Sequence, residues 1–146
     1  MECLVEIDCN ENKLFDILNE YEKLPLYLPR QLQSVKILEK HDEYTLVEAT
    51  IFFKTLIKKK ISQKIKISKN IGRELILEVL DGHAKKTKII ISIETKEKKR
   101  MIKVNCNLKL SLKTAILYPI AKREYQPLVT GICKKMILSV NEMVKN

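Results

Sequence analysis

The side chains best suited to chemistry in the C-terminal part of the chain are Arg123 and Tyr125. A guanidinium and a phenol that converge on a substrate carbonyl would polarise it and stabilise an enolate. The two histidines have no such role: His83 follows an Asp-Gly turn signal, and His41 lies in a second turn beside two acidic residues. Because neither histidine has the spacing of a catalytic dyad or triad, the pattern favours a binding protein over an enzyme.

The remaining reactive residues lack the spacing of a metal or nucleophile site. The cysteines form no Cys-x-x-Cys pair and lie among apolar neighbours, so we expect small core residues rather than disulfide-bonded or metal-binding thiols. No glycine-rich phosphate-binding loop is present either. The sequence therefore predicts no catalytic residue, no metal and no cofactor. The four cysteines are Cys3, Cys9, Cys106 and Cys133.

The composition is that of one basic domain. The 146 residues carry a formal net charge of +10, made chiefly of lysine, which favours acidic partners such as nucleic acid, anionic lipid or an acidic protein. The sequence has no run of about 18 or more apolar residues, and its first residues carry acid where a signal peptide would carry base. We expect a single domain over residues 1–146, located in the cytosol or at the periphery of a membrane.

A long amphipathic helix is predicted over residues 114–145. Apolar residues recur there every three or four positions and so share one face, and the stripe is wider than that of a coiled coil. Pro127 interrupts the stripe, and a proline inside a helix removes one backbone hydrogen bond. We expect Pro127 to kink the helix or to mark the start of its straight part, with residues 118–126 as a separate, movable segment over a pocket.

The rest of the chain predicts an antiparallel sheet, because apolar and polar residues alternate along it. Between the first two strands, Asn10 can cap a helix, and Pro25 and Pro29 limit a second helix to one short turn. No helix separates the later strands, so they pair as consecutive hairpins. The fold class is α+β, with a seven-stranded curved antiparallel sheet wrapped around the long C-terminal helix. The predicted strands are residues 2–9, 34–40, 44–54, 57–70, 74–80, 86–95 and 101–112.

The apolar side of these strands is expected to face the apolar stripe of the helix. A curved sheet closed by one helix either packs solid or leaves an apolar hollow, and a hollow binds ligands where a few polar groups converge. Periodicity alone leaves both alternatives open. The candidate polar groups are Gln63, Tyr118, Arg123, Glu124 and Tyr125. The predicted ligand-binding residues are Ile61, Gln63, Ile65, Leu77, Val79, Ile91, Val104, Cys106, Leu108, Tyr125, Val129, Ile132 and Met136.

Lysines gather on the polar side of the strand over residues 57–70. The simplest interpretation is a solvated face that also discourages edge pairing. Alternatively, the lysines dock on anionic headgroups, each contributing about 1 kcal/mol. RNA is a further alternative, although the face lacks the interleaved aromatic residues of a single-strand binder. The predicted anionic-surface residues are Lys58, Lys59, Lys60, Lys64 and Lys66.

Three consecutive motifs form the opening of the chain: a Phe-Asp helix over residues 12–21, a proline-bounded turn over residues 24–29 and a Ser-Val strand over residues 34–38. This opening is similar to that of the START-like superfamily, which includes the polyketide cyclase/dehydrase and lipid-transport families. The order of one strand, two small helices, six strands and a long helix resembles its helix-grip fold. The stretch over residues 110–117, with the helix after it, resembles the coenzyme Q-binding branch.

The resemblance implies a cavity between sheet and helix that binds a lipid, an isoprenoid quinone, a polyketide or a similar apolar molecule. It does not imply an enzyme, because catalysis in this superfamily is added by particular pocket residues. Some relatives in the same branch associate with ribosomes, so an RNA- or ribosome-associated interaction protein is the alternative function. A cyclase-like enzyme using Arg123 and Tyr125 is the third. The abundant lysine and Pro127 depart from the usual pattern of the superfamily.

Overall fold

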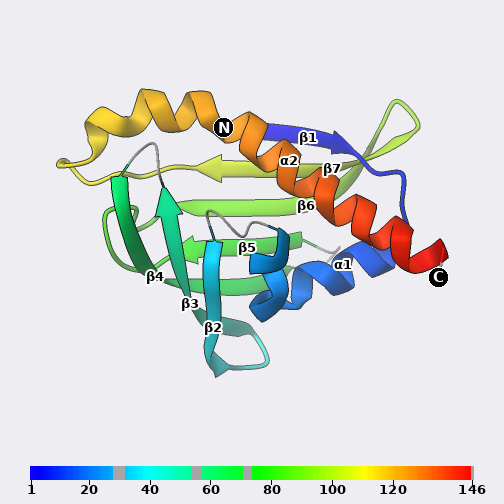
Figure 1. Cartoon of the computed structure of the whole chain (residues 1–146), viewed down its shortest axis with the longest axis horizontal. Coiled ribbons are helices and arrows are strands. Elements are labelled where there is room, and N and C mark those ends of the chain that lie inside the picture. The colour runs from blue at the N-terminus through cyan, green and yellow to red at the C-terminus, as the bar shows by residue number, and fades with distance from the viewer. Residues whose placement is uncertain (28–31, 54–56, 71–73, 146) are drawn as a thin grey trace.

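The computed structural model describes residues 1–27, 32–53, 57–70 and 74–145, and within these ranges it describes the backbone alone at residues 53, 57–59, 121, 124, 125, 128 and 143–145. A curved sheet is covered on one face by helices (Figure 1). The elements in chain order are β1 (Glu2–Glu6), α1 (Glu11–Asn19), η1 (Tyr21–Tyr27), β2 (Leu32–Lys40), β3 (Tyr44–Phe53), β4 (Ile57–Asn70), β5 (Glu74–Val79), β6 (Lys88–Lys96), β7 (Lys99–Asn107), η2 (Ala115–Leu117) and α2 (Tyr118–Lys145).

The described strands form one sheet in the order β1-β7-β6-β5-β4-β3-β2. Every neighbouring pair is antiparallel, and β2 to β7 follow one another as hairpins. β1 instead lies at the far edge beside β7. This arrangement confirms the predicted α+β architecture, with a seven-stranded curved sheet, a long C-terminal helix and two short helices between the first two strands.

The first strand is shorter than predicted. β1 ends at Glu6, not at residue 9, because the chain already turns there into α1. Asn10 is the N-cap of α1, and its side-chain oxygen accepts a hydrogen bond from the backbone N–H of Lys13 at 3.2 Å. The backbone N–H of Ile7 still donates to the carbonyl of Arg100 at 2.8 Å, so the chain stays attached to β7 as it leaves the sheet.

The last strand is also shorter than predicted. β7 ends at Asn107, not at residue 112, because its register partner Lys88 is the first residue of β6. Beyond this pair, the hydroxyl of buried Thr87 accepts from the N–H of Lys109 at 2.9 Å and donates to its carbonyl at 3.1 Å. A side chain therefore satisfies the backbone groups that a longer strand would have paired.

The core lies between the sheet and the helices. α2 contacts β1, α1 and η1, and Figure 1 shows it passing over β1 toward α1. Leu14, Val47, Ile102 and Val140 are among the most buried side chains, and they come from four different elements. Full burial of such an aliphatic side chain contributes about 1.5 to 3 kcal/mol. No helix within the described ranges is both long and apolar enough to cross a bilayer.

α2 continues through Pro127 but changes direction along its length. In Figure 1 the amber first part of the helix and the orange-to-red second part run at an angle to each other. A proline in a helix interior lacks the N–H for the i−4 hydrogen bond, and its ring clashes with that carbonyl, here of Arg123. Residues 118–126 are therefore the first turns of α2 itself, not the separate segment that the sequence predicted.

Candidate ligand-binding site

The strand registers bring the predicted inward side chains together on one face of the sheet. Ile65 of β4 lies opposite Val79 of β5, and Ile91 of β6 lies opposite Val104 of β7. Directly opposite residues in an antiparallel pair point to the same face, and these residues belong to the core or pack against it. The predicted separation of an apolar inner face from a lysine-bearing outer face is confirmed.

The inner face is only partly covered by the helices. Val79, Val104, Cys106 and Met136 are buried. Half-buried aliphatic side chains retain apolar surface that an apolar ligand would remove from water. The half-buried members of the predicted set are Ile61, Ile65, Leu77, Ile91, Leu108, Val129 and Ile132. The side chain of Tyr125 lies outside the described residues.

Gln63 supplies a polar group on this apolar face. It lies opposite Ala49 in the β3–β4 register and is 8% exposed. A Cβ atom at Gly82, which has a φ of +78°, would lie 3.6 Å from Nε2 of Gln63. The amide is therefore next to the turn between β5 and β6, at one end of the inner face. There it could orient the polar end of a ligand whose apolar part lies along the sheet.

A hydrogen-bonded chain ties this turn to the segment after β7. Nδ1 of His83 lies 2.9 Å from Oγ of Ser111, which lies 3.0 Å from Oγ1 of Thr114. The N–H of Ser111 also donates to the carbonyl of His83 at 2.8 Å. His83 was predicted to serve the turn, whereas the role of Ser111 and Thr114 was missed. Nothing in the alternation of apolar and polar residues signals a contact between two loops so far apart in sequence.

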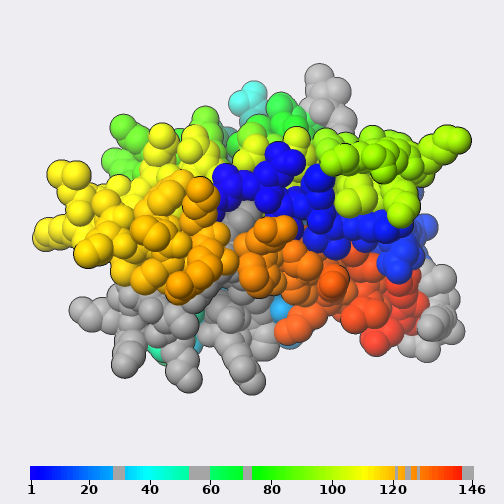
Figure 2. Space-filling view, turned by 90° about the horizontal axis from the view of Figure 1, so that it is seen from above, coloured from blue at the N-terminus to red at the C-terminus, as the bar shows by residue number. Residues whose placement is uncertain are grey.

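Two of the predicted polar candidates lie elsewhere. Tyr118 is 41% exposed, and Arg123 is also exposed, so neither is enclosed beneath α2. Arg123 instead lines an open groove of about 850 Å³ along the flank of α2, and Figure 2 shows the surface hollowed there beside the start of β1. The described lining residues are Pro119, Lys122, Arg123, Gln126, Pro127, Thr130, Gly131 and Lys134. The side chain of Glu124 lies outside the described residues.

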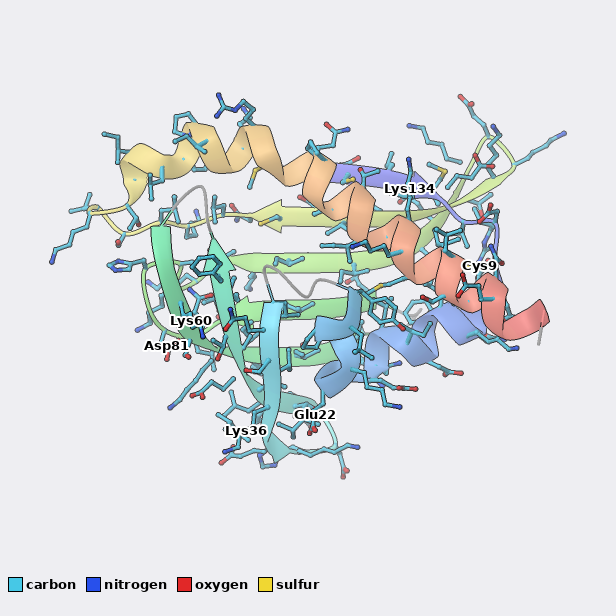
Figure 3. The ribbon with its side chains drawn as sticks, in the orientation of Figure 1. Cys9, Glu22, Lys36, Lys60, Asp81 and Lys134 are labelled. Atoms are coloured by element: carbon cyan, nitrogen blue, oxygen red, sulfur yellow. The ribbon has the colours of Figure 1, made fainter. Side chains whose placement is uncertain are left out.

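The lysines of β4 lie on the outer face, interleaved with acid. Lys60 and Lys64 are exposed, and Figure 3 shows Lys60 near the same end of the sheet as Asp81. Half-buried Lys66 lies with Nζ 5.0 Å from the ring centroid of Tyr44. The registers set Lys64 opposite Glu48 and Lys66 opposite Glu78, so carboxylates offset part of this positive charge. The side chains of Lys58 and Lys59 lie outside the described residues.

The cysteines contribute to the core rather than to a reactive centre. Cys3, Cys106 and Cys133 are buried as predicted, and Cys9 is half-buried. Burial, reinforced by the neighbouring Cys3, raises the pKa of Cys133 to about 12. Burial also raises the pKa of Cys9 and of Cys106 above the ordinary value. These thiols are protonated at neutral pH and are therefore poor nucleophiles.

Comparison with known proteins identifies the fold. No protein-family model and no curated protein matches the chain. Among solved structures, it is similar to a START superfamily protein from Mycobacterium smegmatis (TM-score 0.78, 12% identity, covering 98% of this chain and 97% of that one). It is also similar to the Zhui aromatase/cyclase from Streptomyces sp. R1128 (0.73, 10%, 99% and 94%). A third is the protein TTHA0849 from Thermus thermophilus (0.77, 12%, 98% and 99%).

These likenesses extend over nearly the whole of each chain, so they concern the complete arrangement of strands and helices rather than one motif. At such low identities they show the fold alone. The chain has the START-like, helix-grip fold, as the resemblance of its N-terminal motifs implied. This fold places the inner face of the sheet against the C-terminal helix, where the half-buried aliphatic residues of this chain lie.

Proposed function

We propose that the protein binds an apolar small molecule, such as a lipid, an isoprenoid quinone or a polyketide-like compound, between the inner face of the sheet and α2. The observation that carries this proposal is the row of half-buried aliphatic residues on the central strands, including Ile65, Leu77 and Ile91. A well-packed core buries such side chains fully. The fold supports the proposal because a START superfamily protein and an aromatase/cyclase share it.

Gln63 is proposed to give the site its polar contact. It is the buried amide on an otherwise aliphatic part of β4, and its neighbours on that face are Ile61 and Ile65. A buried amide without a partner is costly, so it favours a ligand that carries a carbonyl or hydroxyl at this end. Quinones, fatty acids and polyketides all carry such oxygens, so Gln63 narrows the ligand to amphiphiles of this kind.

The two other functions have less support. The interaction-protein alternative relied on the lysines of β4, but Lys64 and Lys66 face carboxylates of neighbouring strands. The cyclase alternative relied on Arg123, which is exposed on the flank of α2. Carbonyl chemistry in a dry pocket needs its donors inside that pocket, and the exposure of Arg123 does not meet this requirement.

Native mass spectrometry of the purified protein, followed by organic extraction, is the first experiment. A co-purifying quinone, isoprenoid or fatty acid would support the proposal and identify the ligand class. A protein that carries no such molecule and also leaves a panel of fluorescent fatty acids and quinones unbound would contradict it.

Two neighbouring residues of β6 provide a matched pair of variants, because successive side chains of a strand point to opposite faces. Ile91 lies on the inner face opposite Val104, whereas Ile90 lies on the outer face opposite Asn105. If the inner face borders a hollow, Ile91→Phe should fold normally and weaken binding, while Ile90→Phe leaves binding unchanged. If the space is filled, Ile91→Phe should instead cost about 1 to 3 kcal/mol of stability through overpacking.

A further inference from the structure

The segment between β7 and α2 exposes large apolar side chains at one end of the molecule. We call residues 108–123 the tip segment. Leu112 is 98% exposed, Ile116 is 82% exposed and Tyr118 is 41% exposed. Figure 2 shows this segment, in yellow to amber, projecting at the left end of the molecule. Three large apolar side chains held in water within seven residues form a patch of the kind that marks an interaction site.

The backbone of the tip segment holds these side chains outward. The N–H of Thr114 donates to the carbonyl of Ser111 at 3.0 Å, and the N–H of Leu117 donates to the carbonyl of Thr114 at 2.9 Å. These bonds form two consecutive turns, with Leu112 within the first and Ile116 within the second. Thr114, shared by both turns, is buried. The exposure of Leu112 and Ile116 is therefore fixed by the local fold.

The charge around these apolar residues is of one sign. Residues 108–123 contain no aspartate or glutamate. The same is true of residues 82–87, which His83 ties to Ser111. The exposed cations of the two segments are Lys85, Lys86, Lys109, Lys113, Lys122 and Arg123. α2 also begins here, with no acid in its first turn, so the positive end of its dipole adds to the same field.

The tip segment differs from the other basic surface of the protein. On β4, Lys64 and Lys66 alternate with aliphatic residues of the inner face and lie opposite Glu48 and Glu78. In the tip segment, cations and exposed aliphatic side chains share the same short stretch without a carboxylate. Charge and apolar surface together therefore single out the tip segment.

We propose that the tip segment docks the protein on an anionic lipid bilayer. Leu112 and Ile116 insert among the acyl chains, Tyr118 lies at the headgroup level, and the lysines contact acidic headgroups. A bilayer is the partner that offers both a plane of negative charge and an apolar layer beneath it. Nucleic acid would reward the charge but would leave the two aliphatic side chains without a partner, because it is bound through phosphates and stacked bases.

The proposed docking surface lies beside the proposed ligand site. The turn over residues 81–87, which is hydrogen-bonded to the tip segment, also contains Gly82, the neighbour of Gln63. A bilayer at the tip would thus face the polar end of the inner face, where an amphiphilic ligand would enter. Docking does not depend on that ligand, however, and can be measured with protein that binds none.

A single tryptophan gives the direct test, since the natural chain contains none. Leu112→Trp should shift its fluorescence to shorter wavelength with vesicles of phosphatidylcholine and phosphatidylserine, and high salt should reverse the shift. Leu138→Trp, at a position 61% exposed in the second part of α2, is the matched control and should not shift. Equal shifts with vesicles of phosphatidylcholine alone, or no shift with either kind of vesicle, would overturn the proposal.

Charge variants test the second part of the surface by vesicle sedimentation. Lys109→Ser combined with Lys113→Ser should weaken partitioning into anionic vesicles by about 25-fold, or about fivefold for each lysine. Lys60→Ser combined with Lys64→Ser, on the outer face of β4, should leave it nearly unchanged. If the β4 pair matters more, the tip is not the docking surface. If RNA shifts the tryptophan of Leu112→Trp and anionic vesicles do not, the surface binds nucleic acid instead.

Discussion

Cys3 and Thr130 contact each other across almost the whole chain, with Sγ and Oγ1 3.2 Å apart. Cys3 lies in β1, the edge strand that pairs with β7, and Thr130 lies in α2 three residues beyond Pro127. The contact therefore joins the first strand to the last helix just after the proline. Together with the apolar contacts of α2 it fixes where the second part of the helix lies on the sheet.

Replacing Thr130 by valine should lower the free energy of unfolding by about 1 kcal/mol or less, because the change keeps the shape and removes one weak hydrogen bond. Urea denaturation checks this value. Thr50→Val is the matched control: Oγ1 of Thr50 lies 3.2 Å from Oγ of Ser62, but the pair is exposed on the outer face, so its loss should have less effect. A larger loss at Thr50 would mean that the Cys3–Thr130 contact does not stabilise the helix position.

Replacing Pro127 by alanine should raise the free energy of unfolding, by at most about 3 kcal/mol, the difference between the two residues in a helix interior. Alanine restores the backbone N–H that can donate to the carbonyl of Arg123. Pro119→Ala is the control, because a proline in the first turn of a helix removes an N–H that has no helical partner. It should leave stability nearly unchanged.

The same two variants can be compared by circular dichroism, where Pro127→Ala should increase the helical signal. The groove beside Pro127 and Gly131 should then change shape as α2 straightens. If Pro127→Ala destabilises the protein instead, the bend is required by the packing of α2 on β1, and the proline only accommodates it.

Stability should fall at alkaline pH in a way that depends on Cys133. The pKa of its thiol is raised from 9.0 to about 12 in the folded protein, first by burial and then by Cys3. Between these values the unfolded thiol loses its proton while the folded thiol keeps it. The folded state therefore binds more protons, and the free energy of unfolding decreases as the pH rises above about 9.

Denaturant unfolding of the natural protein and of Cys133→Ala, measured over a series of alkaline pH values, checks this expectation. The variant should lose stability less steeply with pH, although Cys106, whose pKa is also raised, leaves part of the slope. Identical slopes for the two proteins would contradict the assignment to Cys133. Below about pH 9 the two curves should run parallel, since both states then keep the thiol protonated.

Much of the fold could be predicted from the sequence. Alternation placed Ile65, Leu77 and Ile91 on the inner face and the lysines of β4 on the outer one, because a strand has a period of two. The three-and-four spacing likewise indicated α2, and the N-cap of α1 was evident at Asn10. These features depend on neighbours along the chain, so a single sequence contains them.

The features that depend on contacts between distant segments could not be predicted. Glu48 and Glu78 face the lysines of β4 only because the burial of the inner face fixes the strand registers. His83 meets Ser111 only because β6 and β7 end where they do. The outward position of Leu112 follows from a turn held by Thr114 and Ser111, whereas the sequence alone extended β7 through that residue. Local periodicity thus determines which face a side chain takes, and tertiary packing decides what it faces.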